Sequence, residues 1–287
     1  QTGLLVCIFA FFQIGYFLTT KKSLGSVWYL TDRDGYSIFR IGSFFWDVNH
    51  FAAYIASMVP MCFAIFKLSK YKNKKVAVIF TTLIFLICVY LTKSRSAWFG
   101  LAASLGMFTL FWYLKYYKKY TKKIFKLFLL SLPVIVFFLF IQFETIKSNY
   151  DFFMHQRKDS LTSHITLLRG ANEIFRKNPI LGVGYGNFGE GFRNSSFKEE
   201  YFKIEKELVD QRIPGHSLWG ETIAETGILG ILSLISIIFY ILVNLSRTFF
   251  SQVNKNKSIL TLALICSFIS LLVSGVFYSY NQEFFYF

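Results

Sequence analysis

Seven long apolar runs constrain this chain more than any other feature of its sequence. They cover residues 3–18, 48–66, 76–92, 97–114, 124–143, 218–243 and 258–280. Each run approaches the roughly 20 residues that an α-helix needs to cross a bilayer, and none alternates apolar and polar residues as a barrel strand does. A helix satisfies its own backbone hydrogen bonds in lipid. The runs therefore predict an all-α fold, a polytopic bundle of membrane helices.

The composition agrees with this class, because 54% of the residues are hydrophobic and 36 are Phe. The four cysteines stand singly inside apolar runs, where cysteine acts as a small buried hydrophobe. The first apolar run starts almost at once after Gln1, and the last one ends in aromatic residues. We therefore expect one membrane domain over residues 1–287 that is an excerpt of a longer chain.

The net charge of +15 is concentrated in loops that contain no acidic residue. Five lysines lie in 67–75, six in 115–126, and Arg247 heads a third basic stretch that ends at Lys257. By the positive-inside rule these loops are cytoplasmic, so the charge reports topology and contact with anionic lipid rather than nucleic acid. The N-terminal edge of the sequence is then inside and the C-terminal edge outside. The loops predicted to lie outside are 19–47, 93–96 and 144–217.

The outer loop 144–217 is too long for a simple connection. A helix is expected in its middle, capped by Asp159 or Ser160 and ended by Asn178-Pro179. Its predicted buried face consists of Leu161, Ile165, Leu168, Ala171 and Phe175. The glycines of NPILGVGYGNF follow at alternate positions, with Gly184 in the middle. They fit either a sharp turn under the cap or a backbone cradle for an anion.

Arg95 lies in LTKSRSAWFG, a hairpin too short to leave the outer membrane surface. It can be an arginine that extends along a helix end to reach water, as we expect for Lys93. Its neighbours Ser94 and Ser96 are small, however, and small residues pack inside membrane bundles. An ionisable group among them indicates a functional site.

The stretch PGHSLWGETIAETGILG leads from the outer loop into the next apolar run. His216 stands at the expected helix start, and Glu221 and Glu225 are four residues apart on one helix face. A carboxylate inside the membrane boundary needs a partner or a polar cavity. Together with Arg95, these residues predict an acid–base and anion site. His50 and His155 are not part of such a group of ionisable residues in the sequence.

Four motifs in this order resemble the O-antigen ligase and polymerase superfamily. They are the segment GSFFWDVNHFAAYIASMVP (42–60), the hairpin SRSAWFG, the loop motif LLRGANEIFRKNPILGVGYGNF and the stretch HSLWGETIAETGILG. The resemblance covers about residues 40–287. It implies transfer of a glycan from an undecaprenyl-diphosphate carrier to an acceptor hydroxyl, at the outer face of the bacterial cytoplasmic membrane.

The resemblance also implies particular residue roles and a glycosyltransferase-C-like helical bundle that needs neither metal nor cofactor. Arg95 and Arg169 match the diphosphate contacts, and His216 matches the catalytic histidine. Glu221 or Glu225 is expected to orient the imidazole or hold the acceptor. The departures are Ser96, where glycine is common, and Ser217, where asparagine is common. No residues with metal-ligand spacing occur in the outer loops.

Three functions are compatible with these motifs. The first expectation is a polymerase of capsule or another cell-envelope polysaccharide. The second is a ligase that transfers the finished glycan to lipid, cell wall or protein. The third is a transporter of the same lipid-linked glycan, although the sequence shows no internal repeat of the kind that transporters often contain. The expected partners are the lipid-linked donor, a glycan acceptor and the bilayer.

Overall fold

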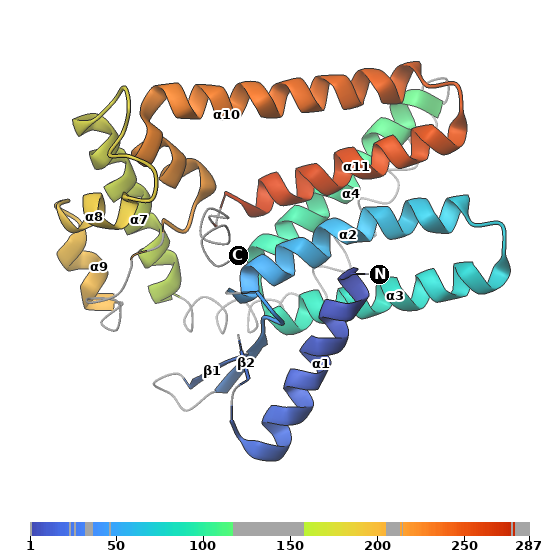
Figure 1. The fold of residues 1–287 in the computed structure, drawn as a ribbon, viewed down its shortest axis with the longest axis horizontal. Coiled ribbons are helices and arrows are strands. Elements are labelled where there is room, and N and C mark those ends of the chain that lie inside the picture. Colours follow the sequence, from blue (N-terminus) through green and yellow to red (C-terminus); the bar gives the residue numbers. More distant parts are fainter. Residues whose placement is uncertain are drawn as a thin grey trace, which may run out of the picture.

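A computed structural model shows a helical bundle with a helical cap at one end (Figure 1). It describes residues 2–22, 24–25, 27–31, 37–45, 47–116, 158–204, 213, 215–276 and 278. Within these residues, six helices are long and apolar enough to cross a membrane, which confirms six of the predicted spans. They are α1 (Thr2–Thr20), α2 (Val48–Leu68), α3 (Lys72–Thr92), α4 (Arg95–Tyr116), α10 (Leu218–Ser251) and α11 (Lys255–Ser274). The predicted span 124–143 lies outside the described residues.

Local chemistry explains where several of these helices begin and end. Asp47 caps α2 through a hydrogen bond from the backbone N–H of Asn49, and Asn254 caps α11 in the same way. Both caps satisfy donors that the first turn leaves without helical partners. Lys93 ends α3 in a left-handed conformation with φ 52°. These ends set the positions of the loops that form the site.

The inner bundle is packed through small residues. On α4, the residues Ser96, Ala97, Gly100 and Ser104 are buried, and a Cβ at Gly100 would lie 2.6 Å from the carbonyl oxygen of Ser270 on α11. Such close backbone approach is typical of membrane helix pairs. Many large apolar side chains on α3, α4 and α10 are instead exposed, as expected of surfaces that face lipid.

One element was not predicted, namely a short β-hairpin in the loop between α1 and α2. Strand β1 (Val27–Thr31) pairs antiparallel with β2 (Ser37–Ile41), with Trp28 opposite Arg40. The sequence carries Asp34-Gly35 between the strands, a dipeptide typical of hairpin turns, and this signal was overlooked. The bundle remains mostly helical, and the hairpin places Arg40 beside α2 and α3.

The cap consists of α7 (Lys158–Lys177), α8 (Phe188–Arg193), α9 (Lys198–Ile204) and the first turns of α10. The predicted helix is confirmed and ends at Lys177, directly before Asn178-Pro179, but the predicted N-caps Asp159 and Ser160 are wrong, because the helix already includes Lys158. Its predicted buried face is wrong in part, because Ala171 is buried but Ile165 and Leu168 are each more than 40% exposed. The helix is instead rotated so that Phe192 of α8 packs against Gly170. The buried core of the cap consists of Leu167, Ala171, Ile174, Phe188, Phe192, Tyr201, Ile213 and Ala224.

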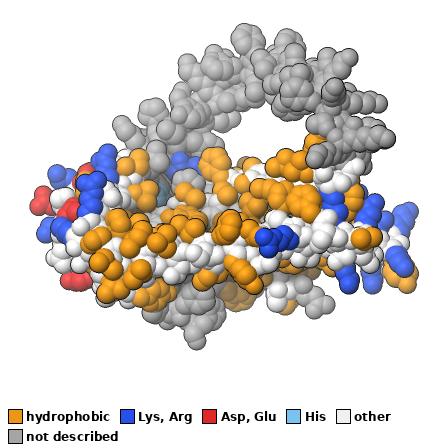
Figure 2. Space-filling view, turned by 90° about the horizontal axis from the view of Figure 1, so that it is seen from above, with side chains coloured by type: hydrophobic (Ala, Val, Ile, Leu, Met, Phe, Trp, Pro, Cys, Tyr) orange, Lys and Arg blue, Asp and Glu red, His pale blue; other side chains and the backbone are white. Residues whose placement is uncertain are grey.

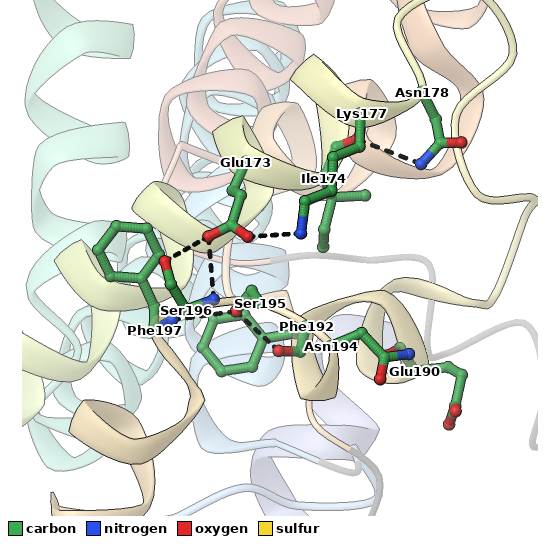
Figure 3. A network of polar contacts seen from close by, with 10 residues as sticks. All are labelled: Glu173, Ile174, Lys177, Asn178, Glu190, Phe192, Asn194, Ser195, Ser196 and Phe197. Atoms are coloured by element: carbon green, nitrogen blue, oxygen red, sulfur yellow. Dashed lines mark hydrogen bonds and ion pairs between the residues drawn. The ribbon is translucent and has the colours of Figure 1, made fainter.

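A carboxylate joins α7 to the turn between α8 and α9 (Figure 3). Glu173 accepts hydrogen bonds from Nζ of Lys177 at 2.7 Å and from the hydroxyl and backbone N–H of Ser196 at 2.6 and 3.0 Å. The hydrogen bond from Lys177, followed by those from Ser196, lowers the pKa of Glu173 from 4.5 to about 2. The ionised carboxylate therefore stabilises the cap.

Helix α10 bends sharply at Gly227, where φ is 62° and ψ is −159° (Figure 1). The bend interrupts the helical hydrogen bonds, and the loop after α7 takes up backbone groups on both sides of it. Ile228 donates its N–H to the carbonyl oxygen of Pro179 at 2.8 Å, and Gly184 donates to that of Glu225 at 2.9 Å. The bend thus separates a short cap segment of α10 from its long apolar part.

The two ends of the bundle differ in charge. At the end away from the cap, the charged side chains on this face are Lys and Arg, whereas at the cap Lys and Arg lie together with Asp and Glu (Figure 2). The turns after α2 and α10 both lie at the basic end (Figure 1). Lys115, at the end of α4, donates there to the carbonyl oxygen of Gln252 and the hydroxyl of Ser258, both at 2.7 Å. Two of the loops predicted to be cytoplasmic, those after α2 and α10, therefore lie at the same end of the bundle.

Candidate functional site

Arg95 is the first residue of α4 and lies at the cap end of the bundle. The turn from α3 contains only Lys93 and Ser94. Ser94 and Ser96 are buried on either side of Arg95, with their hydroxyl oxygens 3.0 Å apart. Arg95 itself is half-buried. The hairpin therefore holds this arginine in packed surroundings at a helix N-terminus.

Arg40 on β2 is a second arginine at this place, and it was not predicted. Its buried guanidinium donates two hydrogen bonds of 2.7 Å, from Nε to the carbonyl oxygen of Thr92 and from Nη2 to Oδ1 of Asn49. Burial lowers the pKa of Arg40, and the charge of Arg95 acts in the same direction. The two guanidinium groups, hereafter the arginine pair, thus lie close enough to repel each other.

Asp47 balances part of this charge. Its carboxylate accepts hydrogen bonds of 2.6 Å from the backbone and side-chain N–H groups of Asn49, and its charge raises the pKa of Arg40. The N-termini of α2 and α4 contribute further partial positive charge at this end. The arginine pair, Asp47 and these helix ends together favour a bound anion.

His216 stands immediately before α10 in an unusual backbone conformation. Its φ is 46°, in the left-handed region that residues with side chains rarely adopt. The next residue, Ser217, is the N-cap and accepts a hydrogen bond from the N–H of Gly220 at 3.2 Å. Serine and asparagine cap helices about equally well, which accounts for serine at this position of the motif.

Two aromatic rings lie near the His216 imidazole, and a third lies near one of these two. The ring of His164, on α7, lies 4.9 Å from that of His216, and the ring of Tyr278 lies 6.0 Å from it. His50, near the start of α2, lies 6.3 Å from Tyr278. Tyr278 is held near His216 because its carbonyl oxygen accepts a hydrogen bond from the N–H of Leu218 at 3.0 Å. We call these three histidines and the tyrosine the histidine cluster.

Both central histidines are neutral near pH 7. Burial, followed by the nearby His216 and Arg95, lowers the pKa of His164 from 6.5 to about 4. Burial also lowers the pKa of His216, while the charge of Asp47 raises it and His50 lowers it further. Because Arg95 lowers the pKa of His164 and Asp47 raises the pKa of His216, the arginine pair and the histidine cluster lie near each other.

The two predicted carboxylates of α10 both precede the bend and lie in the first turns of the helix, which pack with the cap. Glu225 is buried, and its Oε1 accepts the backbone N–H of Phe188 at the start of α8 at 3.0 Å. Glu221 is also buried, and its carboxylate lies so close to Gly215 that a Cβ there would be 2.6 Å from Oε2. Glu221 therefore supports the residue before His216, whereas Glu225 joins α10 to α8.

Arg169 and Gly184 occupy different surroundings from the cluster. Arg169 follows His164 by five residues, about 140° around the helix, and its Nη1 lies 4.0 Å from Oε1 of Glu200 on α9. Its side chain is 58% exposed. The N–H of Gly184 is bonded to Glu225, which favours the turn interpretation of the glycine motif over an anion cradle.

The residues near this site that were not predicted have only weak signals in the sequence. His50 stands at the cap-side start of a span, the same signal that singled out His216. Arg40 lies two residues before Gly42, where the first of the four family motifs begins. Tyr278 is one of 17 tyrosines and could not be distinguished. Within the part of the chain that the structure describes, no group of His, Cys, Asp or Glu side chains is arranged to hold a metal ion.

Comparison with known proteins gives one family. The family described as O-antigen ligase matches residues 80–235, which include Arg95, His164, Arg169 and His216. No curated protein matches the chain. The matched segment excludes Arg40, His50 and Tyr278, which complete the site from outside it.

Proposed function

The chain belongs to the O-antigen ligase family, a family of bacterial membrane proteins of polysaccharide biosynthesis that points to ligase- or polymerase-type glycosyl transfer, and from this premise we propose its specific reaction. The protein transfers a glycan from an undecaprenyl-diphosphate carrier to an acceptor hydroxyl, with polysaccharide polymerisation as the first candidate. The observation that carries the proposal is the arginine pair beside two neutral histidines, a combination suited to an anionic leaving group and a hydroxyl nucleophile.

The leaving group explains the arginines. When the bond between the sugar C1 and the diphosphate oxygen breaks, its electron pair stays on the diphosphate, which gains negative charge. Arg95 presents a planar, permanently charged fork to phosphate oxygens. Donors already oriented toward developing charge commonly make the largest catalytic contribution. Arg40 stiffens this arrangement, because its bond to Thr92 fixes the end of α3 from which the Arg95 hairpin starts.

The nucleophile explains His216. The acceptor oxygen forms the new bond to C1 and must lose its proton, which a neutral imidazole accepts. Burial keeps the pKa of His216 below its ordinary value, so the ring is in the proton-accepting form at neutral pH. The diphosphate leaves with its electron pair, and the proton remains on His216 until solvent removes it.

The remaining predicted residues keep distinct roles in the proposal. Arg169 is the second diphosphate contact expected from the family motif, and reaching the donor requires it to leave Glu200. Glu221 supports the His216 turn. The arginines replace a metal ion, so transfer should survive chelation by EDTA. Loss of transfer in EDTA that Mg²⁺ or Mn²⁺ restores would refute this part.

The orientation follows from charge. Because the turns after α2 and α10 are basic and lie at the end away from the cap (Figure 1), we place that end in the cytoplasm. The cap and the site then lie at the outer face of the cytoplasmic membrane. A transporter is less well supported, because the charged residues assigned to the site gather at one end of the bundle rather than near its middle.

Analysis of surface glycan from a deletion strain distinguishes the two enzymatic functions. A polymerase predicts that single repeat units accumulate on the carrier. A ligase predicts full-length chains that stay on the carrier. Normal surface glycan, with no accumulated carrier-linked product, would refute both.

A further inference from the structure

The left-handed backbone at His216 requires support from its surroundings. A residue with a side chain at φ 46° is strained relative to ordinary conformations. Such a conformation persists only where neighbouring groups hold it, and it often marks a functional position. The groups that hold His216 are therefore candidates for a role in positioning its ring.

Several neighbours fix the residues on either side of His216. Ser217 caps α10, and the N–H of Leu218 is shared between the carbonyl oxygens of Gly275 and Tyr278 at 2.9 and 3.0 Å. These contacts fix the start of the helix. They do not determine the direction of the His216 ring, which the aromatic neighbours confine.

His164 is the side chain that contacts both the backbone and the ring of His216. The two rings lie 4.9 Å apart at 66°, and a hydrogen bond to the backbone of His216 raises the pKa of His164. Tyr278 lies 5.7 Å from His164 and 6.0 Å from His216, nearly perpendicular to both. The rings of His164, His216 and Tyr278 thus form a compact triangle, in which His216 contacts both of the others.

We propose that His164 is a positioning residue for His216, which stabilises its left-handed backbone and directs its imidazole toward the acceptor. This inference rests on the proposed function, in which His216 takes the acceptor proton. It assigns a role to a histidine that lies outside the four motifs of the sequence. Because His164 is neutral near pH 7, it supports His216 without adding a charge that would oppose protonation of the neighbouring ring.

The test compares two substitutions of similar volume. His164→Gln keeps an N–H that can reach the His216 backbone, whereas His164→Leu fills the space but cannot donate. In a reconstituted assay with lipid-linked donor, we expect His164→Leu to lower kcat about 10- to 100-fold, the range typical of a misplaced catalytic group. The KM for the donor should stay within about twofold, because the arginine pair is unchanged, and His164→Gln should recover most of kcat.

The control is Asn172→Ala, an exposed position on the same helix, which should match the parent. Equal turnover of the Gln and Leu variants would overturn the inference. So would a loss in His164→Leu that raises the donor KM as much as it lowers kcat, because that pattern indicates general damage to the cap. If His216→Ala is fully active, the proposed function itself fails. If His216→Ala is inactive while His164→Leu is normal, only this inference fails.

Discussion

Substitution of Gly227 by alanine tests how the bend in α10 supports the site. Two contributions to the loss of stability can be estimated from the structure. The φ of 62° and ψ of −159° lie in a region almost restricted to glycine, where a residue with a side chain is strained by about 2 kcal/mol. The new Cβ would also lie 2.4 Å from the carbonyl oxygen of Ile180, so the loop must move. Two backbone hydrogen bonds from the bend, Ile228 to Pro179 and Leu229 to Ile180, are then weakened or lost.

At about 1 kcal/mol net for each hydrogen bond, the expected destabilisation by Gly227→Ala is about 3–4 kcal/mol. Gly106→Ala is the matched control, because Gly106 lies in α4 with nothing within 4 Å of an added Cβ. Alanine in place of glycine inside a helix stabilises it by up to about 1 kcal/mol. The same substitution should therefore have opposite signs at the two positions.

The protein carries its own reporters for this measurement. All four cysteines are free and buried, so a thiol-reactive dye detects thermal unfolding in detergent. Gly227→Ala should lower Tm clearly, while Gly106→Ala should leave it unchanged or slightly higher. Because the bend also sets the start of α10, transfer by Gly227→Ala should fall below that of the parent at temperatures where it remains folded. A Gly227→Ala protein that unfolds and turns over like the parent would refute the role assigned to the bend.

Two further predictions concern pH. The acid limb of kcat/KM should lie below about pH 6.5, the ordinary pKa of histidine, because burial lowers the pKa of His216. Asp47→Asn, which keeps a good N-cap, should move that limb to lower pH, since Asp47 raises the pKa of His216; an unmoved limb would contradict the assignment of His216 as the base. The contribution of Glu173 to stability should be complete above pH 4.5 and be lost as pH falls toward its folded pKa of about 2. Glu173→Gln should therefore lower Tm at pH 7 and show a smaller further loss in acid, and equal acid sensitivity of both proteins would refute this.

The spans were predictable because each depends on a local apolar run. The helix of the cap was predictable from its apolar positions and from Asn178-Pro179 at its end, although it begins before the predicted N-caps. Its buried face was not, because the packing of Phe192 on Gly170 outweighs the apolar periodicity that had selected Ile165 and Leu168. A pattern of apolar residues specifies a helix more reliably than it specifies which side meets a partner.

The site was predictable only in part. Arg95 and His216 stand in short motifs, and their chemistry can be seen from neighbouring residues. Arg40 and His164 enter through tertiary contacts with residues more than 50 positions away. The same limit explains the glycine motif and the carboxylate of Glu225, whose backbone and side-chain partners depend on the bend in α10.

The most direct test of the central claim scores donor binding and glycan transfer separately for Arg95 and His216 variants in the reconstituted assay. Arg95→Ala should reduce transfer about 10²- to 10³-fold, equivalent to roughly 3–4 kcal/mol of lost transition-state stabilisation, and Arg95→Lys should recover part of it. His216→Ala should abolish transfer and leave donor binding near that of the parent. Lys93→Ala, which removes a neighbouring cation of the same hairpin, should match the parent. An Arg95→Ala protein that inserts, folds and transfers glycan at the parent's rate would contradict the account.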